Sequence, residues 1–208
     1  MPTRNNLLLV TLIAACGNGE EPVRVEDLRA PRLVQAIPKP GFLLTRTDGT
    51  EFDFRRETAG TLTFLFFGYT NCPDVCPLHM GNIAAVLDSL PPEVSRQVRF
   101  VFVTTDPDRD TPERLGSWLA EFDSTFIGLT GTPAALETAQ RSVGALPARR
   151  EGTASIGGYS VSHAAQLFAF TPDDSAHVVY PWGVQRQDFI SDIPKLLRLY
   201  GGRRPSRP

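Results

Sequence analysis

The amino-acid sequence predicts an α/β fold: a central mixed sheet with helices on both faces. Residues 61–67 and 99–105 form two largely apolar runs, which is typical of strands that are buried on both sides. Between and after these runs, apolar residues recur at helical spacing. Strands and helices that alternate in this way favour a sheet whose parallel strands are joined by right-handed crossovers.

The individual elements follow in chain order from turn and cap signals. Asp48-Gly49 and the turn at 172–174 each separate two short apolar segments, which predicts two β-hairpins. Thr111-Pro112 and Thr132-Pro133 predict helix starts, because threonine caps a helix and proline is tolerated at its first position. The expected elements are a hairpin of 42–44 and 50–54, strand 61–67, a helix over 78–90, strand 99–105, helices 111–122 and 132–145 around strand 126–129, a hairpin of 165–170 and 177–180, and a helix over 187–200 that Pro194 should kink.

The N-terminal flank has the features of an export signal. Arg4 precedes the apolar stretch 7–15, and no acidic residue occurs before Glu20. Nine apolar residues are too few to span a bilayer, which needs roughly 20. The stretch ends in Ile-Ala-Ala-Cys, which resembles a bacterial lipobox, so Cys16 is expected to carry lipid; an unmodified Cys16 beside an ordinary cleavage site is the alternative. The predicted organisation is a lipoprotein signal peptide (1–15), an extended tether (16–40), a folded domain (41–200) and a disordered tail (201–208), held on a membrane of the bacterial cell envelope outside the cytoplasm.

The charge of the chain excludes one class of partner. The 21 Lys and Arg residues are balanced by 23 Asp and Glu residues, and the formal net charge is −2. The basic residues are scattered and form no stripe that could follow a phosphate backbone. No nucleic acid partner is therefore expected.

The cysteines point to chemistry. With Cys16 lipidated, the domain keeps only Cys72 and Cys76, and the loop between them is too short for a disulfide to stabilise the fold much. The pair follows strand 61–67, at the end of a sheet strand where ligands of α/β folds gather. If the segment is helical, a spacing of four places both sulfurs on one face. The sequence therefore predicts a redox or metal site here.

Four segments carry a resemblance to a known family. FGYTNCPDVCP at 67–77, VTTDPDRDTPERL at 103–115, FIGLTGT at 126–132 and VSH at 161–163 resemble the Sco (SenC) family of copper chaperones, over about residues 38–200. The resemblance implies a thioredoxin-like fold with an added β-hairpin and one copper ion, Cu(I) or Cu(II), bound by Cys72, Cys76 and His163. It also implies a role in assembling the binuclear copper centre of cytochrome c oxidase. The implied partners are the oxidase subunit that carries this centre and another periplasmic copper chaperone.

The chemistry of the donors agrees with copper. Two thiolates suit soft Cu(I), and an imidazole accepts both oxidation states. His79 is the rival ligand, since Cys72, Cys76 and His79 fall on one face of a helix at i, i+4 and i+7, whereas the resemblance places the ligand at His163. His177, in the far arm of the second hairpin, is expected to be structural.

Two further expectations concern the surroundings of the site and its activity. Asp106 is expected to lie behind the ligands and support one of them, with a turn held by Arg109 and Asp110 as the alternative. The family often has an aspartate before the histidine, and here Ser162 takes that place. Cys72 and Cys76 are also candidates for a redox-active dithiol that reduces the cysteines of the oxidase copper site. Whether the chain is an enzyme stays open, although the C-x3-C spacing favours a metallochaperone over a C-x-x-C oxidoreductase.

Overall fold

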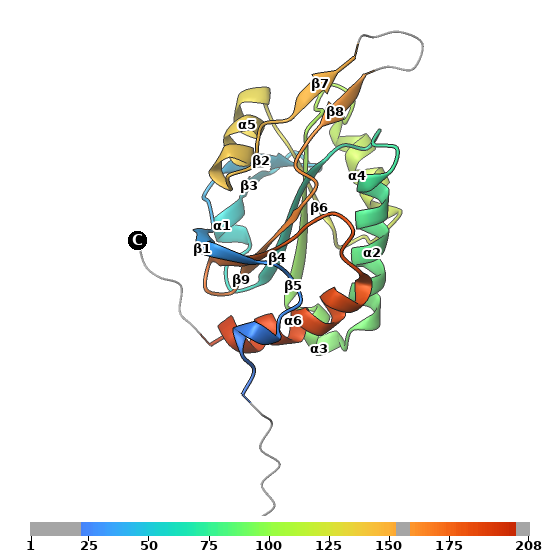
Figure 1. Cartoon of the computed structure of the whole chain (residues 1–208). Helices are drawn as coiled ribbons and strands as arrows, with labels where there is room; N and C mark the ends of the chain where they lie inside the picture. Colours follow the sequence, from blue (N-terminus) through green and yellow to red (C-terminus); the bar gives the residue numbers. More distant parts are fainter. Residues whose placement is uncertain (1–21, 153–158, 203–208) are drawn as a thin grey trace, which may run out of the picture.

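The computed structural model describes residues 22–152 and 159–202, and its centre is an eight-stranded sheet (Figure 1). The strand order is β1-β10-β9-β4-β5-β6-β2-β3. The neighbours β4, β5 and β6 run parallel, and all other neighbours in this sheet run antiparallel. The strands are β1 (Arg32–Pro38), β2 (Leu43–Arg46), β3 (Glu51–Asp53), β4 (Leu62–Gly68), β5 (Val98–Thr104), β6 (Ile127–Thr130), β9 (Leu167–Thr171) and β10 (Ser175–Tyr180).

Helices cover both faces of the sheet, as the sequence predicted (Figure 1). Every residue of β4 is buried, because alternate side chains enter two separate cores. Phe64 and Phe66 pack with α2 (Val75–Ser89), α4 (Pro112–Ala120) and α6 (Arg186–Tyr200). Leu65 and Phe67 face the opposite core, to which α1 (Phe54–Glu57) and α5 (Pro133–Ser142) contribute. The short helices η1 (Val25–Asp27) and α3 (Pro92–Ser95) were not predicted.

The predicted helix starts are confirmed by their caps. The Thr111 side chain accepts a hydrogen bond from the Arg114 amide, and the Thr132 side chain accepts one from the Ala135 amide. Proline occupies the first turn of both helices, where its missing N–H costs no helical hydrogen bond. Pro194 lies inside α6, which continues past it to Tyr200.

The expected boundary between tether and domain is wrong for the described part of 16–40. Strand β1 pairs with β10, and the Lys39 side chain is fully buried, with Nζ 3.1 Å from an Asp174 carboxylate oxygen. The amides of Arg29 and Ala30 donate to the carboxylate of Asp192 in α6. Edge strands tolerate proline at their ends and need no strict apolar alternation, so this segment gave no strand signal in the sequence. The folded domain therefore begins well before residue 41.

A second, two-stranded sheet was also missed. Strands β7 (Arg149–Glu151) and β8 (Ser160–Ser162) pair with each other and project from one end of the molecule (Figure 1). Their residues are mostly polar and exposed, so hydrophobic alternation could not reveal them.

The predicted signal peptide, Cys16 and the tail from residue 203 lie outside the described residues. Within the described residues, no helix combines the length and apolarity needed to cross a bilayer.

Candidate metal centre

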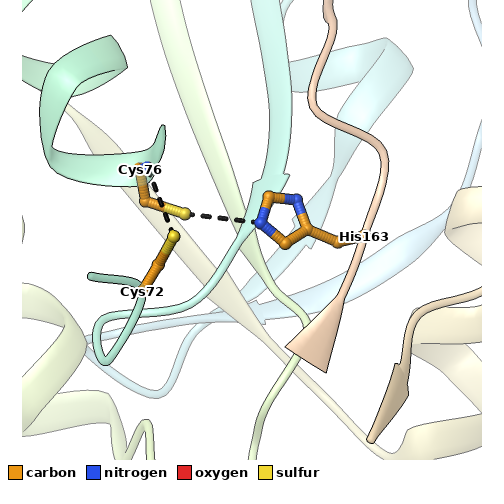
Figure 2. A group of neighbouring side chains, drawn as sticks. All are labelled: Cys72, Cys76 and His163. Atoms are coloured by element: carbon orange, nitrogen blue, oxygen red, sulfur yellow. Dashed lines mark hydrogen bonds between the residues drawn. The ribbon is translucent and has the colours of Figure 1, made fainter. Parts of the chain in front are cut away.

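Cys72, Cys76 and His163 come together at the end of the sheet where β4 gives way to α2 (Figure 2). One potential ligand atom from each residue lies within 4.8 Å of the other two. The two thiols come from the corner between β4 and α2, and the imidazole comes from the residue after β8. Two sulfurs and one nitrogen can thus face one ion from two parts of the chain.

The cysteines meet for a different reason than the predicted helical face. Helix α2 begins at Val75, so Cys76 lies in its first turn and Cys72 lies in the turn before it. The Cys76 amide donates to the Cys72 sulfur over 3.4 Å, and both thiols are free. Cys76 is fully buried, and a Cβ atom at Gly68 would lie only 2.8 Å from its sulfur, so glycine is required there.

A buried carboxylate fixes the chain just before Cys72. Asp110 accepts hydrogen bonds from the Thr70 amide (3.1 Å) and the Thr70 hydroxyl (2.6 Å). The Thr104 hydroxyl donates at 2.6 Å to Oδ2, the oxygen that also accepts from the Thr70 amide. Because Thr104 ends β5 and Thr70 precedes the cysteines, Asp110 ties the cysteine turn to the sheet. The sequence interpretation gave Asp110 only a local role in its own turn.

The imidazole of His163 presents one nitrogen to the sulfurs. Its Nε2 lies 3.6 Å from the Cys76 sulfur, and its Nδ1 lies 3.1 Å from the Ala164 carbonyl oxygen. A proton on Nδ1 that is donated to this carbonyl leaves the Nε2 lone pair free for a metal. The rings of Phe66 and Tyr69 stand edge-on to the imidazole, each with its centroid 5.7 Å away, and limit its rotation.

The two thiols have opposite electrostatic environments. A hydrogen bond from the Cys76 thiol lowers the pKa of Cys72 to about 3; burial opposes the shift and His163 adds to it. Burial raises the pKa of Cys76, and the neighbouring Cys72 sulfur raises it further. These opposite shifts favour a thiolate at Cys72 and a thiol at Cys76 in the metal-free pair. A metal that binds both sulfurs must displace the proton of this thiol.

The other two histidines lie outside the group. His79 Nε2 is 3.0 Å from the Ala165 carbonyl oxygen, and the ring packs against Phe66 and Trp182. Burial lowers the pKa of His79. His177 is 3.0 Å from an Asp173 oxygen and stacks on Tyr200. The geometry thus gathers the predicted trio and assigns His79 to packing.

Within the described residues, the Asp106 side chain is bonded to none of the three candidate ligands and pairs with Arg109, as in the alternative that the sequence left open. Its buried carboxylate is paired with Arg109 Nε and accepts a hydrogen bond from the Tyr159 hydroxyl at 2.7 Å. Arg150 in β7 lies 3.8 Å from the same carboxylate, and none of these three partners is a ligand of the trio. Tyr159 was missed by the sequence interpretation, because an isolated tyrosine in a polar stretch carries no local signal.

Comparisons with known proteins identify the family of the chain. The sequence profile of SCO1/SenC matches residues 32–198. A Stutzerimonas stutzeri protein is 37% identical to this chain over 160 residues. The aligned region covers 73% of this chain and 74% of that protein. A mitochondrial SCO1 homolog of Arabidopsis thaliana is 33% identical over 159 residues, 76% of this chain, and this chain spans about half of its length (47%). The structure of Bradyrhizobium japonicum ScoI with copper bound superposes with a TM-score of 0.68 at 29% identity, over 77% of this chain and 99% of that one. The chain belongs to the SCO1/SenC family and has its thioredoxin-like fold.

Proposed function

We propose that this member of the SCO1/SenC family is a membrane-anchored copper chaperone that assists assembly of the binuclear copper centre of cytochrome c oxidase. It binds one copper ion through Cys72, Cys76 and His163 and passes it to the oxidase subunit that carries this centre. The observation that carries the proposal is the preformed group of two sulfurs and one imidazole nitrogen within 4.8 Å of one another.

The donor set selects the metal. Soft thiolates favour Cu(I), and the imidazole retains affinity for Cu(II), so the trio can hold the ion through a change of oxidation state. Thiolate–metal bonds are about 2.3 Å long, so ligands of one ion lie within about 4.6 Å of each other. The observed separations need only a small contraction to meet this limit. The copper-bound structure of the Bradyrhizobium japonicum relative supports the same choice.

Copper transfer requires that a partner reach the ion while the chaperone still holds it. His163 is only half-buried and lines a surface hollow of about 420 Å³ together with Leu146, Pro147 and Ala164. Leu146 exposes 83% of its surface, which gives a partner protein an apolar contact beside the ligand. A donor from the partner can therefore approach from the imidazole side and replace His163 first.

The anchor belongs to the same proposal. Lipidation of Cys16 holds the domain at a membrane of the bacterial cell envelope, in the periplasm or otherwise outside the cytoplasmic membrane. There it can meet the oxidase subunit and another periplasmic copper chaperone. Two or more acyl chains give stable membrane attachment, whereas one does not. In a Cys16→Ala variant exported by a cleavable signal, the protein should move to the soluble fraction and still bind copper. An unmodified Cys16 in a soluble wild-type protein would remove the anchor from the proposal.

A thiol-disulfide reductase is the second candidate, and the Cys72 thiolate favours it. In this reaction, Cys72 attacks a disulfide of the target and forms a mixed disulfide. The Cys76 sulfur then attacks Cys72, and the target leaves with two thiols. Two electrons and two protons pass from the chaperone to the target, and the chaperone keeps a Cys72–Cys76 disulfide.

One experiment compares the two candidates. The full chain is purified from cells grown with copper, its copper content is measured, and the reduced metal-free protein is mixed with a peptide that carries an oxidised cysteine pair. We expect one copper per chain in wild type and in the control His177→Ala, and little in Cys72→Ala or His163→Ala. Wild type that holds no copper but reduces the peptide in one turnover would replace the copper chaperone by the reductase.

A further inference from the structure

His163 lies between a two-stranded appendage, formed by β7 and β8, and the main sheet. Strand β8 (Ser160–Ser162), which leads into His163, pairs with β7. Within the described residues, no backbone ladder connects this pair to the eight-stranded sheet, which the chain enters again at β9 (Leu167–Thr171). On the β8 side, the distance between the imidazole and the sulfurs therefore depends on side-chain contacts between the appendage and the body of the domain.

Tyr159 makes the densest set of these contacts. Its hydroxyl donates to Asp106 (2.7 Å), and its carbonyl accepts from Arg109 Nη1 (3.0 Å). The guanidinium of Arg109 lies 3.8 Å from the centre of the Tyr159 ring. Arg150, in β7 of the same appendage, lies 4.7 Å from this ring centre and pairs with Asp108 of the body. The cation–π contact with Arg109 adds to the attachment of the ring to the body of the domain.

A second contact continues from Arg109 to the site. Its guanidinium also lies 5.6 Å from the ring centre of Tyr69, three residues before Cys72. The Tyr69 hydroxyl accepts a long hydrogen bond from the Val161 amide (3.4 Å), and its ring stands edge-on to His163. Arg109 thus lies between one tyrosine on the histidine side and another on the cysteine side.

We propose that Tyr159 and Arg109 are positioning residues: they fix β8 so that His163 Nε2 faces the two sulfurs before any metal arrives. The buried carboxylate of Asp106 holds both side chains, because it pairs with Arg109 Nε and accepts a hydrogen bond from the Tyr159 hydroxyl. The measurements of copper affinity described next rest on the proposed function. The position of the imidazole does not rest on it, because that position is a property of the metal-free protein.

The test uses Tyr159→Phe, which removes the hydroxyl, and Tyr159→Leu, which also removes the aromatic ring. Tyr159 is partly exposed, so neither change empties a core position. Residues that orient a metal ligand typically contribute about 10- to 100-fold to affinity. We expect Tyr159→Leu to weaken copper affinity about 10-fold and Tyr159→Phe less. Arg109→Lys, which keeps the charge and loses the flat stacking group, should fall between wild type and Tyr159→Leu. The control Arg141→Gln breaks a surface pair with Glu137 on α5 and should leave the affinity unchanged.

A double variant separates positioning from a general structural role. If Tyr159 acts through the imidazole, Tyr159→Leu has no further effect on copper affinity once His163→Ala is present. If Tyr159 merely supports the fold, the double variant should bind copper more weakly than His163→Ala does. The further loss should equal the loss that Tyr159→Leu causes in the wild-type protein. That second result would overturn the proposal.

A metal-free measurement distinguishes this proposal from failure of the proposed function. The imidazole signals of the reduced apo protein are followed by NMR, with His177 as the internal reference. We expect Tyr159→Leu to shift and broaden the His163 signals and leave those of His177 in place. Unchanged His163 signals would overturn the positioning role, whether or not the protein binds copper.

Discussion

The two halves of the metal centre are built in different ways. The cysteine half consists of neighbours in sequence, is buried against β4 and α2, and is tied to β5 by the carboxylate of Asp110. The histidine half comes from a residue 87 positions after Cys76 and is carried by a two-stranded appendage that attaches through side chains. Packed cores are rigid, whereas side-chain attachments can open locally at a small cost in free energy.

We therefore expect the two halves to play different roles in holding and releasing copper. A rigid sulfur pair can retain copper, while an imidazole on a weakly attached strand can leave first and give its position to a ligand of the partner. The two halves should also respond differently to substitution. Changes at the cysteines should alter how strongly copper is retained and how the thiols are oxidised. Changes around His163 should alter the last step of copper binding and the first step of copper release.

The largest expected effect is loss of the whole site by oxidation. Both sulfurs must be available to bind copper, so a Cys72–Cys76 disulfide should abolish binding and reduction should restore it. Mass-shift counting of thiols in apo and copper-loaded protein, before and after mild oxidant, measures this. Copper should protect both thiols. Equal alkylation rates with and without copper would place the ion elsewhere.

Removal of single ligands should come next. Cys72→Ala, Cys76→Ala and His163→Ala should each weaken copper binding roughly 100-fold or more, measured by competition with a chelator. The comparison between the halves adds a distinction: His163→Ala should still form the disulfide on oxidation, and the cysteine variants should not. A His163→Ala protein with wild-type affinity would remove the imidazole from the site.

The cysteine half was largely predictable from sequence, and the reason is locality. An apolar strand, a C-x3-C spacing and a helix start all lie within residues 61–78, so composition and periodicity could place them. The detail that failed was the helical face, because Cys72 precedes α2 and reaches Cys76 through a turn. The alternation of elements and the threonine–proline caps were likewise local signals, and the structure confirms them.

The histidine half could not be derived in the same way. His79 has the better local spacing. His163 was selected over it mainly by resemblance to a family, together with the two prolines beside the cysteines, which suggest an irregular first helical turn. The Tyr159–Arg109 contact and edge strand β1 depend on partners about 50 and about 140 residues away, and such contacts leave no periodicity in the sequence. Strands β7 and β8 are close in sequence, but their mostly polar, exposed residues show no hydrophobic alternation.

A weaker effect should distinguish the two thiols. Since the pKa of Cys72 is lowered, this residue should remain a thiolate from pH 8 down to pH 5, where an ordinary thiol loses about tenfold in thiolate per pH unit. Alkylation of the reduced apo protein by iodoacetamide, mapped by peptide mass spectrometry, should therefore modify Cys72 at a nearly constant rate. Cys76, buried and with a raised pKa, should react last. If the alkylation rate of Cys72 falls tenfold for each pH unit, the pKa of Cys72 is not lowered and the expected thiolate is absent.

A change at Asp110 should weaken the rigid half. Asp110→Asn replaces a charged acceptor of three short hydrogen bonds by a neutral amide, whose NH2 group cannot accept. We expect a loss of about 2 kcal/mol in the free energy of unfolding, measured by urea titration, and faster alkylation of Cys76. Asp173→Asn, on the far hairpin, is the matched control and should leave Cys76 protected. If Asp110→Asn leaves both the free energy of unfolding and the alkylation rate of Cys76 at their wild-type values, the cysteine turn does not depend on the Asp110 carboxylate.

The smallest expected effect on copper concerns His79. Its ring is buried, its Nε2 is engaged with the Ala165 carbonyl oxygen, and it lies outside the group of ligand atoms. Replacing it by alanine removes the partner of a carbonyl that lies two residues after His163, which should lower the free energy of unfolding by about 1–3 kcal/mol. Copper affinity should stay within about threefold of wild type, because Cys72, Cys76 and His163 all remain and β8 is still held at Tyr159. His79→Gln, whose amide can donate to the same carbonyl, should recover part of the stability and leave affinity unchanged. If His79→Ala instead loses copper as strongly as His163→Ala does, the ligand set follows the helical spacing, and the appendage is not the second half of the site.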